Sequence, residues 1–132
     1  SQEFSTLKHF PLESDYLAAR VALGDIEGGA RNRKMEIITA PGAGGGPQIM
    51  VFDNYGIAIK QFFAYNANFR GGVSLTSGDI DNDGLSEIIT GAGPGGTPHV
   101  RILKINKDII GSFYAYPESF SGGVNVGAIE VK

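Results

Sequence analysis

Residues 36–47 read EIITAPGAGGGP and residues 87–98 read EIITGAGPGGTP, so a short β-branched run followed by a glycine-rich segment occurs twice. The two segments are offset by 51 residues (87 − 36 = 51), and the match continues without a gap into the aromatic segments 62–65 and 113–116. A period near fifty residues is a signature of repeat architectures. The sequence therefore predicts a protein built from tandem repeats.

Each repeat is predicted to contain four short antiparallel strands joined by tight turns. The 20 glycines among 132 residues recur in clusters between apolar runs, which is the pattern of many short strands and turns. No window keeps the i, i+3, i+4, i+7 apolar face of an amphipathic helix. For the second repeat we expect a turn at 81–84, a glycine-rich loop at 91–98, and strands at 73–80, 87–90, 99–105 and 108–116.

Four antiparallel strands in about fifty residues are typical of a β-propeller blade. One small sheet cannot bury both of its faces, so we expect an all-β fold in which neighbouring blades stack face to face. The glycine-rich loops are expected to form tight packing corners between blades. A closed propeller needs at least four blades, so about two blades with flanking single strands predict an incomplete propeller.

Residues 1–132 are interpreted as a single repeat domain. Either the chain is a segment of a longer protein that supplies the remaining blades, or several chains self-associate and cover the outer faces and edges. The expected divisions are the end of a preceding repeat and a first strand at 4–23, repeat 1 at 24–77, repeat 2 at 78–128, and the first strand of a third repeat at 123–132.

Composition excludes several classes of function. The net charge of −3 argues against non-specific nucleic-acid binding, which needs a basic surface. No apolar stretch approaches the eighteen or so residues of a membrane span, so membrane insertion is not expected. The chain has no cysteine, which excludes disulfides and zinc–thiolate sites.

The segment 79–87, with the sequence DIDNDGLSE, carries carboxylates at alternate positions. If the chain curls, these carboxylates converge on one point, and a backbone carbonyl can complete an all-oxygen cage. Calcium prefers six to eight oxygen ligands, whereas magnesium demands stricter octahedral geometry and transition metals usually recruit histidine or sulfur. The predicted calcium ligands are Asp79, Asp81, Asp83, the carbonyl of Leu85, and Glu87.

The segment also has features of two other structures, an EF-hand loop and a hairpin turn. It is not a helical EF-hand loop, because the glutamate falls at position 9 instead of 12 and strand sequence flanks it on both sides. A plain hairpin turn remains an alternative, since Asn-Asp-Gly also suits a turn. Mutual repulsion of four carboxylates within nine residues favours a compensating cation, so we expect calcium here and not a plain turn.

The equivalent loop of the first repeat is three residues longer and keeps Asp25, Glu27 and Glu36. It has lost the third acid and gained three cationic residues: Arg31, Arg33 and Lys34. Internal charge pairing can replace an ion there, so we expect this second site to be weak or lost. A longer loop that uses Asn32 as a ligand is the alternative.

Together, GDIDNDG at 78–84, EIITGAGPGG at 87–96 and PHV at 98–100 resemble an FG-GAP/VCBS-type repeat, the blade of integrin-α-like propellers. The resemblance implies a seven-bladed propeller in many relatives. It also implies structural calcium in the loop between the first and second strands of a blade. It further implies extracellular or cell-surface adhesion proteins that bind other proteins or carbohydrates. The repeat number and the altered first loop depart from the pattern.

No catalytic constellation is apparent. His9 and His99 are the only histidines, and there is no cysteine and no Gly-x-Ser-x-Gly elbow. The sequence therefore predicts a protein that is not an enzyme: a calcium-stabilised module for binding protein or carbohydrate. The alternatives are a structural unit that assembles with other chains, and an accessory segment of a larger exported enzyme.

Overall fold

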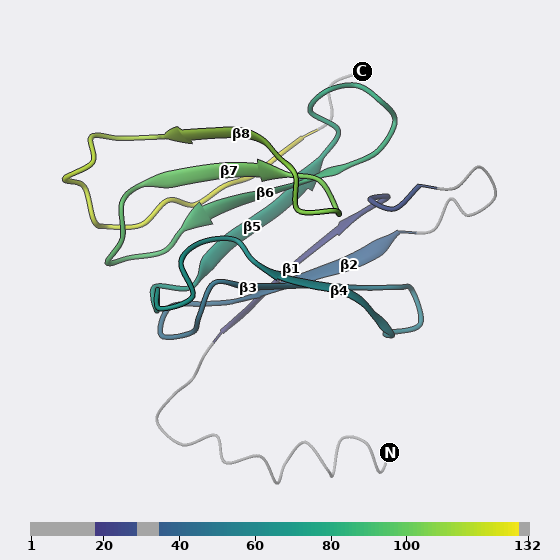
Figure 1. Cartoon of the computed structure of the whole chain (residues 1–132), viewed down its shortest axis with the longest axis horizontal. Coiled ribbons are helices and arrows are strands. Elements are labelled where there is room, and N and C mark those ends of the chain that lie inside the picture. The colour runs from purple at the N-terminus through teal and green to yellow at the C-terminus, as the bar shows by residue number, and fades with distance from the viewer. Residues whose placement is uncertain (1–17, 29–34, 130–132) are drawn as a thin grey trace, which may run out of the picture.

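The computed structural model describes residues 18–28 and 35–129, and these residues form two four-stranded antiparallel sheets (Figure 1). The strand order is β1-β2-β3-β4 in the first sheet and β5-β6-β7-β8 in the second. No helix occurs in these ranges, which confirms the all-β prediction and the four antiparallel strands per repeat. The strands are β1 (Ala19–Gly24), β2 (Glu36–Pro41), β3 (Gln48–Phe52), β4 (Ala58–Phe63), β5 (Val73–Gly78), β6 (Glu87–Ala92), β7 (His99–Leu103) and β8 (Ile109–Tyr114).

The two sheets have the same pattern of strand pairing. Each contains a register irregularity at the same repeat position, between Val51 and Phe52 in the first sheet and between Ile102 and Leu103 in the second. The repeat offset read from the sequence is therefore also the structural offset.

The expected strand ends were wrong by a few residues. β5 ends at Gly78 instead of Ile80, because the chain curls there into the acidic loop. β6 runs on to Ala92, where the sequence predicted an end at Thr90. Gly91 and Ala92 continue to pair with the start of β5. β7 ends at 103 and β8 spans 109–114, each shorter than expected.

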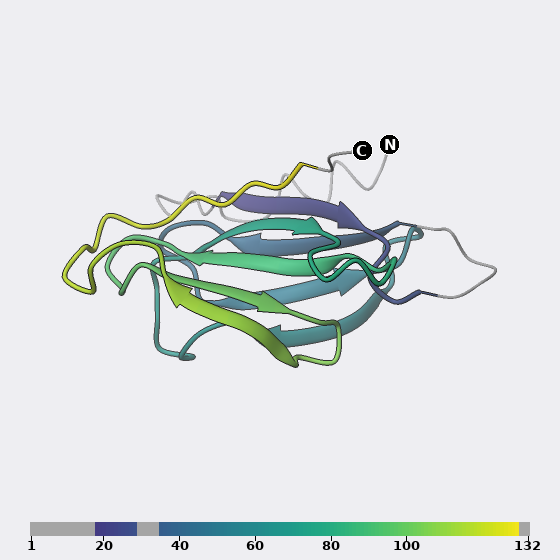
Figure 2. The ribbon, with the colours of Figure 1, turned by 90° about the horizontal axis from the view of Figure 1, so that it is seen from above.

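The sheets pack face to face, with the main core between them (Figures 1 and 2). In β2 buried and half-buried residues alternate, as expected when one face of a strand points into a core. In β6 all six residues are buried, because both of its faces are covered. The residues of the main cluster include Ile38, Ile49, Val51, Phe62, Val73, Ile88 and Leu103.

The second face of β6 is covered by the C-terminal segment 123–129. Val124 and Val126 of this segment pack against Ile89 and Val100, and the amide of Val124 donates to Ala92 O at 2.9 Å. Figure 2 shows the segment, in yellow, running along one side of the molecule. The sequence predicted that this segment is the first strand of a third repeat. As far as Ile129 it is not a strand, because no described strand pairs with it.

The glycine-rich segments bring backbone of the two sheets into close contact. Gly72 has a φ of 73°, and a Cβ atom there would lie 2.2 Å from the carbonyl carbon of Gly42. The amide of Gly72 donates to Gly45 O at 3.1 Å, and its carbonyl accepts from Gly93 at 3.0 Å. These positions need glycine for close backbone approach between sheets and for the left-handed conformation.

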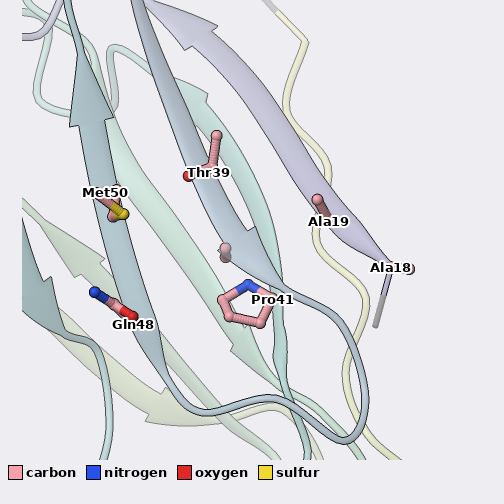
Figure 3. Close-up of a pocket in the computed structure, with 7 residues that line it drawn as sticks. Ala18, Ala19, Thr39, Pro41, Gln48 and Met50 are labelled. Carbon is pink, nitrogen blue, oxygen red and sulfur yellow. The ribbon is translucent and has the colours of Figure 1, made fainter. Parts of the chain in front are cut away.

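The outer face of the first sheet carries a shallow hollow of about 240 Å³ (Figure 3). Its walls come from the ends of β1, β2 and β3, and Figure 3 shows Thr39, Gln48 and Met50 on this face. The lining residues are Ala18, Ala19, Thr39, Ala40, Pro41, Gln48 and Met50.

Part of the predicted organisation lies outside the described ranges. This applies to the expected end of a preceding repeat before residue 18 and to residues 130–132. Within the described ranges, no helix is long and apolar enough to cross a membrane.

Candidate metal centre

The acidic loop joins β5 to β6 and curls through its own side-chain hydrogen bonds. Asp79 accepts from the amide of Asp83 through Oδ1 at 3.1 Å and from Gly84 through Oδ2 at 2.8 Å. Asn82 and Gly84 have φ values of 62° and 90°. Asparagine and glycine tolerate this left-handed conformation, so the local sequence fits the curl that brings the acids together.

Glu87, the first residue of β6, binds the start of the loop through its side chain. Its side chain is 1% exposed, and Oε2 accepts from the amide of Ile80 at 2.7 Å and from that of Asp81 at 3.5 Å. One carboxylate oxygen therefore ties the start of the loop to the first residue of β6. A buried carboxylate is stable only with such partners, so the contacts that satisfy Glu87 also fix the start of the loop.

The four predicted carboxylates, Asp79, Asp81, Asp83 and Glu87, converge. Each offers an oxygen, and these atoms all lie within 4.8 Å of one another. The three aspartates are exposed and Glu87 is buried, so the group opens to solvent on one side. A donor set made only of carboxylate oxygens can hold a hard metal ion. The fifth predicted ligand, the carbonyl of Leu85, stays a prediction.

Lys104 contacts this group and was not predicted. Its ammonium lies 2.9 Å from Asp81 Oδ2, 2.9 Å from Asp83 Oδ2 and 3.3 Å from Glu87 Oε1. The repulsion among the carboxylates is thus partly offset by a cation of the protein itself. A signal existed in the sequence, because the position 51 residues earlier is Asp53 and the repeat changes charge sign there.

These contacts change the proton affinities of both partners. Hydrogen bonds to Asp83 and Asp81 raise the pKa of Lys104 above its usual range. The hydrogen bond from Lys104, followed by the one from the Leu85 amide, lowers the pKa of Asp83. Both shifts favour the charged forms, so the ion pairs persist across the neutral pH range.

The first-repeat loop repeats only part of this geometry. Glu36 is 2% exposed and Oε2 accepts from the amides of Ile26 at 2.8 Å and Glu27 at 3.2 Å, as Glu87 does in the second sheet. Asp25 Oδ1 accepts from the Gly28 amide at 3.3 Å. Among the described residues the three acids Asp25, Glu27 and Glu36 form no converging group.

The remainder of that loop, including Asn32 and the three cationic residues, lies outside the described ranges. A weak or lost second site therefore stays a prediction.

The two loops lie at the same end of the molecule and touch each other. The amide of Ser86 donates to Asp25 O at 2.7 Å. A hollow of about 130 Å³ lies between the loops, and Glu27 from the first loop, with Leu85, Glu87 and Lys104, contributes to its wall. The first loop thus supports the second one through backbone contact.

His99 takes part in packing between the sheets. Its carbonyl accepts from the Tyr65 hydroxyl at 2.8 Å, and its ring lies 5.7 Å from the Tyr65 ring and 5.0 Å from the Tyr114 ring. Burial, and to a lesser extent Arg101, lowers the pKa of His99. This is the environment expected of a structural histidine.

Comparison of the chain with models of protein families, with curated proteins and with solved structures finds no match in any of the three.

Proposed function

We propose that this chain is a non-catalytic, calcium-binding module made of FG-GAP/VCBS-type β-propeller blades, and that the calcium stabilises its loop structure. The observation that carries the proposal is the convergence of Asp79, Asp81, Asp83 and Glu87 within 4.8 Å of one another. The loop stands between the first and second strands of a four-stranded antiparallel sheet. The resemblance to FG-GAP/VCBS-type repeats implies calcium in the loop between these two strands.

The chemistry of the donor set favours calcium over other metals. The ligands are carboxylate oxygens on a loop that is open to solvent on one side, and calcium accepts flexible coordination with additional water or carbonyl oxygens. No histidine or sulfur belongs to the group, which disfavours transition metals.

The proposed biological role is binding of a protein or a carbohydrate at an extracellular or cell-surface location. This role follows from the resemblance to FG-GAP/VCBS-type repeats. The stacked sheets provide a rigid scaffold, and loops on such scaffolds are where binding residues usually lie.

The test is calcium titration by calorimetry, together with thermal unfolding in excess calcium and in a chelator. Wild type is compared with Asp81→Ala and with Glu118→Gln, which removes one exposed acid outside the loop. Binding to the folded state alone stabilises by about 2.7 kcal/mol at a hundredfold excess over Kd.

We expect calcium to raise the Tm of wild type and Glu118→Gln but not that of Asp81→Ala. Absence of both binding heat and a Tm shift in the wild type would contradict the proposal.

A second candidate function is an assembly unit that completes a propeller with other copies of the chain. One observation favours it. Phe62 is 6% exposed between the sheets, whereas its repeat equivalent Phe113 is 52% exposed on the outer face of the second sheet. Exposed apolar surface of this kind marks interaction sites. Light scattering distinguishes the two, since assembly requires a mass that rises with protein concentration.

A further inference from the structure

We propose that Lys104 is a built-in competitor of the metal ion, which holds the acidic loop when no metal is bound and must leave when one binds. The proposal rests on the proposed function, because it states how the calcium affinity of that same site is set. It concerns a residue that lies 17 positions after the loop ends (104 − 87 = 17) and belongs to a different hairpin.

The competition follows from which oxygen atoms are free. Asp81 Oδ1 accepts from the amide of Asp83, Asp83 Oδ1 accepts from that of Leu85, and Glu87 Oε2 accepts from that of Ile80. Each of these three carboxylates therefore has one oxygen engaged by the backbone. The ammonium contacts the other oxygen in every case. A metal ion in this loop needs the same three atoms.

Calcium and the ammonium cannot share these atoms in one arrangement. Calcium binds oxygen at about 2.3–2.6 Å, so an ion at the centre of the group would occupy the space that the ammonium now fills at 2.9–3.3 Å. Two cations so close together would also repel each other strongly. The Lys104 side chain is 31% exposed, so it can move into solvent when a metal ion enters.

The backbone around Lys104 is fixed by the turn between β7 and β8. The amide of Lys104 donates to Asp108 O at 2.9 Å, and its carbonyl accepts from the Lys107 amide at 2.9 Å. The β7–β8 turn lies at the same end of the sheet as the β5–β6 loop, since connections in an antiparallel sheet alternate between its ends. The topology of the sheet thus places Lys104 next to the acidic loop.

The fold itself does not require a lysine at this position. In the first sheet the equivalent residue is Asp53, and its amide donates to Ile57 O at 2.9 Å in the same turn. Asp53 Oδ1 accepts from the amides of Tyr55 and Ile57, both at 2.9 Å. In the second sheet Asn106 accepts from the Asp108 amide at 3.0 Å instead. The side chain at position 104 is released from the turn and reaches the loop.

The charge balance of the acidic loop predicts how removal of Lys104 changes its calcium affinity. Four carboxylates converge in the loop and one lysine contacts three of them, so an uncompensated negative charge remains that attracts a divalent cation. Removing the lysine leaves the metal-free loop with more repulsion and the metal-bound loop without a competitor. Both consequences increase calcium affinity, and the first also destabilises the metal-free protein.

The test compares calcium binding to wild type, Lys104→Gln and Lys60→Gln by calorimetry. Lys60 is an exposed residue of β4 in the other sheet, so its variant has the same net charge as Lys104→Gln. We expect Lys104→Gln to bind calcium at least about tenfold more tightly than wild type, or about 1.4 kcal/mol. Lys60→Gln should bind as wild type does. In a chelator Lys104→Gln should melt below Lys60→Gln, and excess calcium should close that gap.

A measurement on the wild type keeps the test independent of how the variant folds. The Cε–Hε resonance of Lys104 should shift on addition of calcium, while that of Lys60 should stay unchanged. Unchanged Lys104 resonances at saturating calcium would overturn the proposal.

The outcomes separate this inference from the proposed function. Equal affinities for wild type and Lys104→Gln overturn the competition and leave the calcium function intact. Binding by Lys104→Gln alone supports the competition and removes the calcium function from the wild-type protein. If neither protein binds calcium, both proposals fail.

Discussion

The loop after β1 and the loop after β5 begin with an aspartate and end with a buried glutamate. Among the residues that the structure describes, only the second loop gathers four carboxylates. In both sheets the glutamate accepts two backbone amides. The buried glutamate therefore has the same structural role in both loops. What distinguishes the second loop is the acids between its ends and the residue that faces them, which is Lys104 in place of Asp53.

The faces of the two sheets differ in a second way. The face that bears Phe62 is covered by the second sheet. Within residues 18–28 and 35–129, the equivalent face that bears Phe113 is covered only in part, by the segment 123–129. The same repeat sequence therefore supplies a core residue in one sheet and surface in the other. The difference comes from what stacks on each sheet, not from the sheet itself.

The largest expected effect is a difference in stability loss when the phenylalanine at the same repeat position is removed from each sheet. Phe62→Ala should lower the free energy of unfolding by about 3–5 kcal/mol, because it removes a buried ring from the core. Phe113→Ala, at the equivalent position, should cost about 1 kcal/mol or less, because the ring is half exposed. Urea unfolding of both variants at low protein concentration measures the contrast. Equal losses would mean that the outer face of the second sheet is covered in solution.

A smaller effect is expected at the two closing glutamates. Glu36→Ala and Glu87→Ala each remove the acceptor of two backbone amides, so each should lower stability by about 1–3 kcal/mol. Unfolding in a chelator should give similar losses for the two. In excess calcium they should separate, because only Glu87→Ala also removes one of the proposed metal ligands. A calcium response abolished by Glu36→Ala and kept by Glu87→Ala would reverse the assignment of the site.

The smallest expected effect concerns Tyr65, which lies between the sheets and contacts Thr90 Oγ1 at 3.0 Å. Burial raises the pKa of Tyr65 to about 12 from its usual 10.0. Above about pH 10 the unfolded chain ionises this phenol while the folded protein does not. Stability should therefore be complete below that pH and fall as pH rises toward the folded value.

Tyr65→Phe should lower the free energy of unfolding by about 1 kcal/mol at neutral pH, because Thr90 Oγ1 and the His99 carbonyl lose the hydroxyl as a hydrogen-bond partner. It should also flatten the loss of stability between about pH 10 and pH 12. The control is Tyr116→Phe, the equivalent residue on the exposed side of the second sheet. Urea unfolding across this pH range measures both, and a steep alkaline loss that persists in Tyr65→Phe would assign it to another group.

Much of the fold was predictable because its signals are local. The sequence repeats β-branched runs, turn residues and glycine clusters at one offset. These patterns predicted four strands per repeat and the part of the chain that forms each sheet. The strand ends were less predictable. Whether Gly91 and Ala92 continue β6 depends on the partner strand β5, and the curl that ends β5 depends on hydrogen bonds to Asp79.

The sequence by itself determined the repeat, the all-β fold and the identity of the four carboxylates, because alternate acids in a nine-residue loop converge whenever the loop curls. Only the tertiary structure decided which cation faces them. Lys104 lies 21 residues from Asp83 and 23 from Asp81 in the chain, and the turn between β7 and β8 brings it into contact. Local patterns fix local geometry, whereas a contact between two hairpins depends on how the whole sheet is assembled.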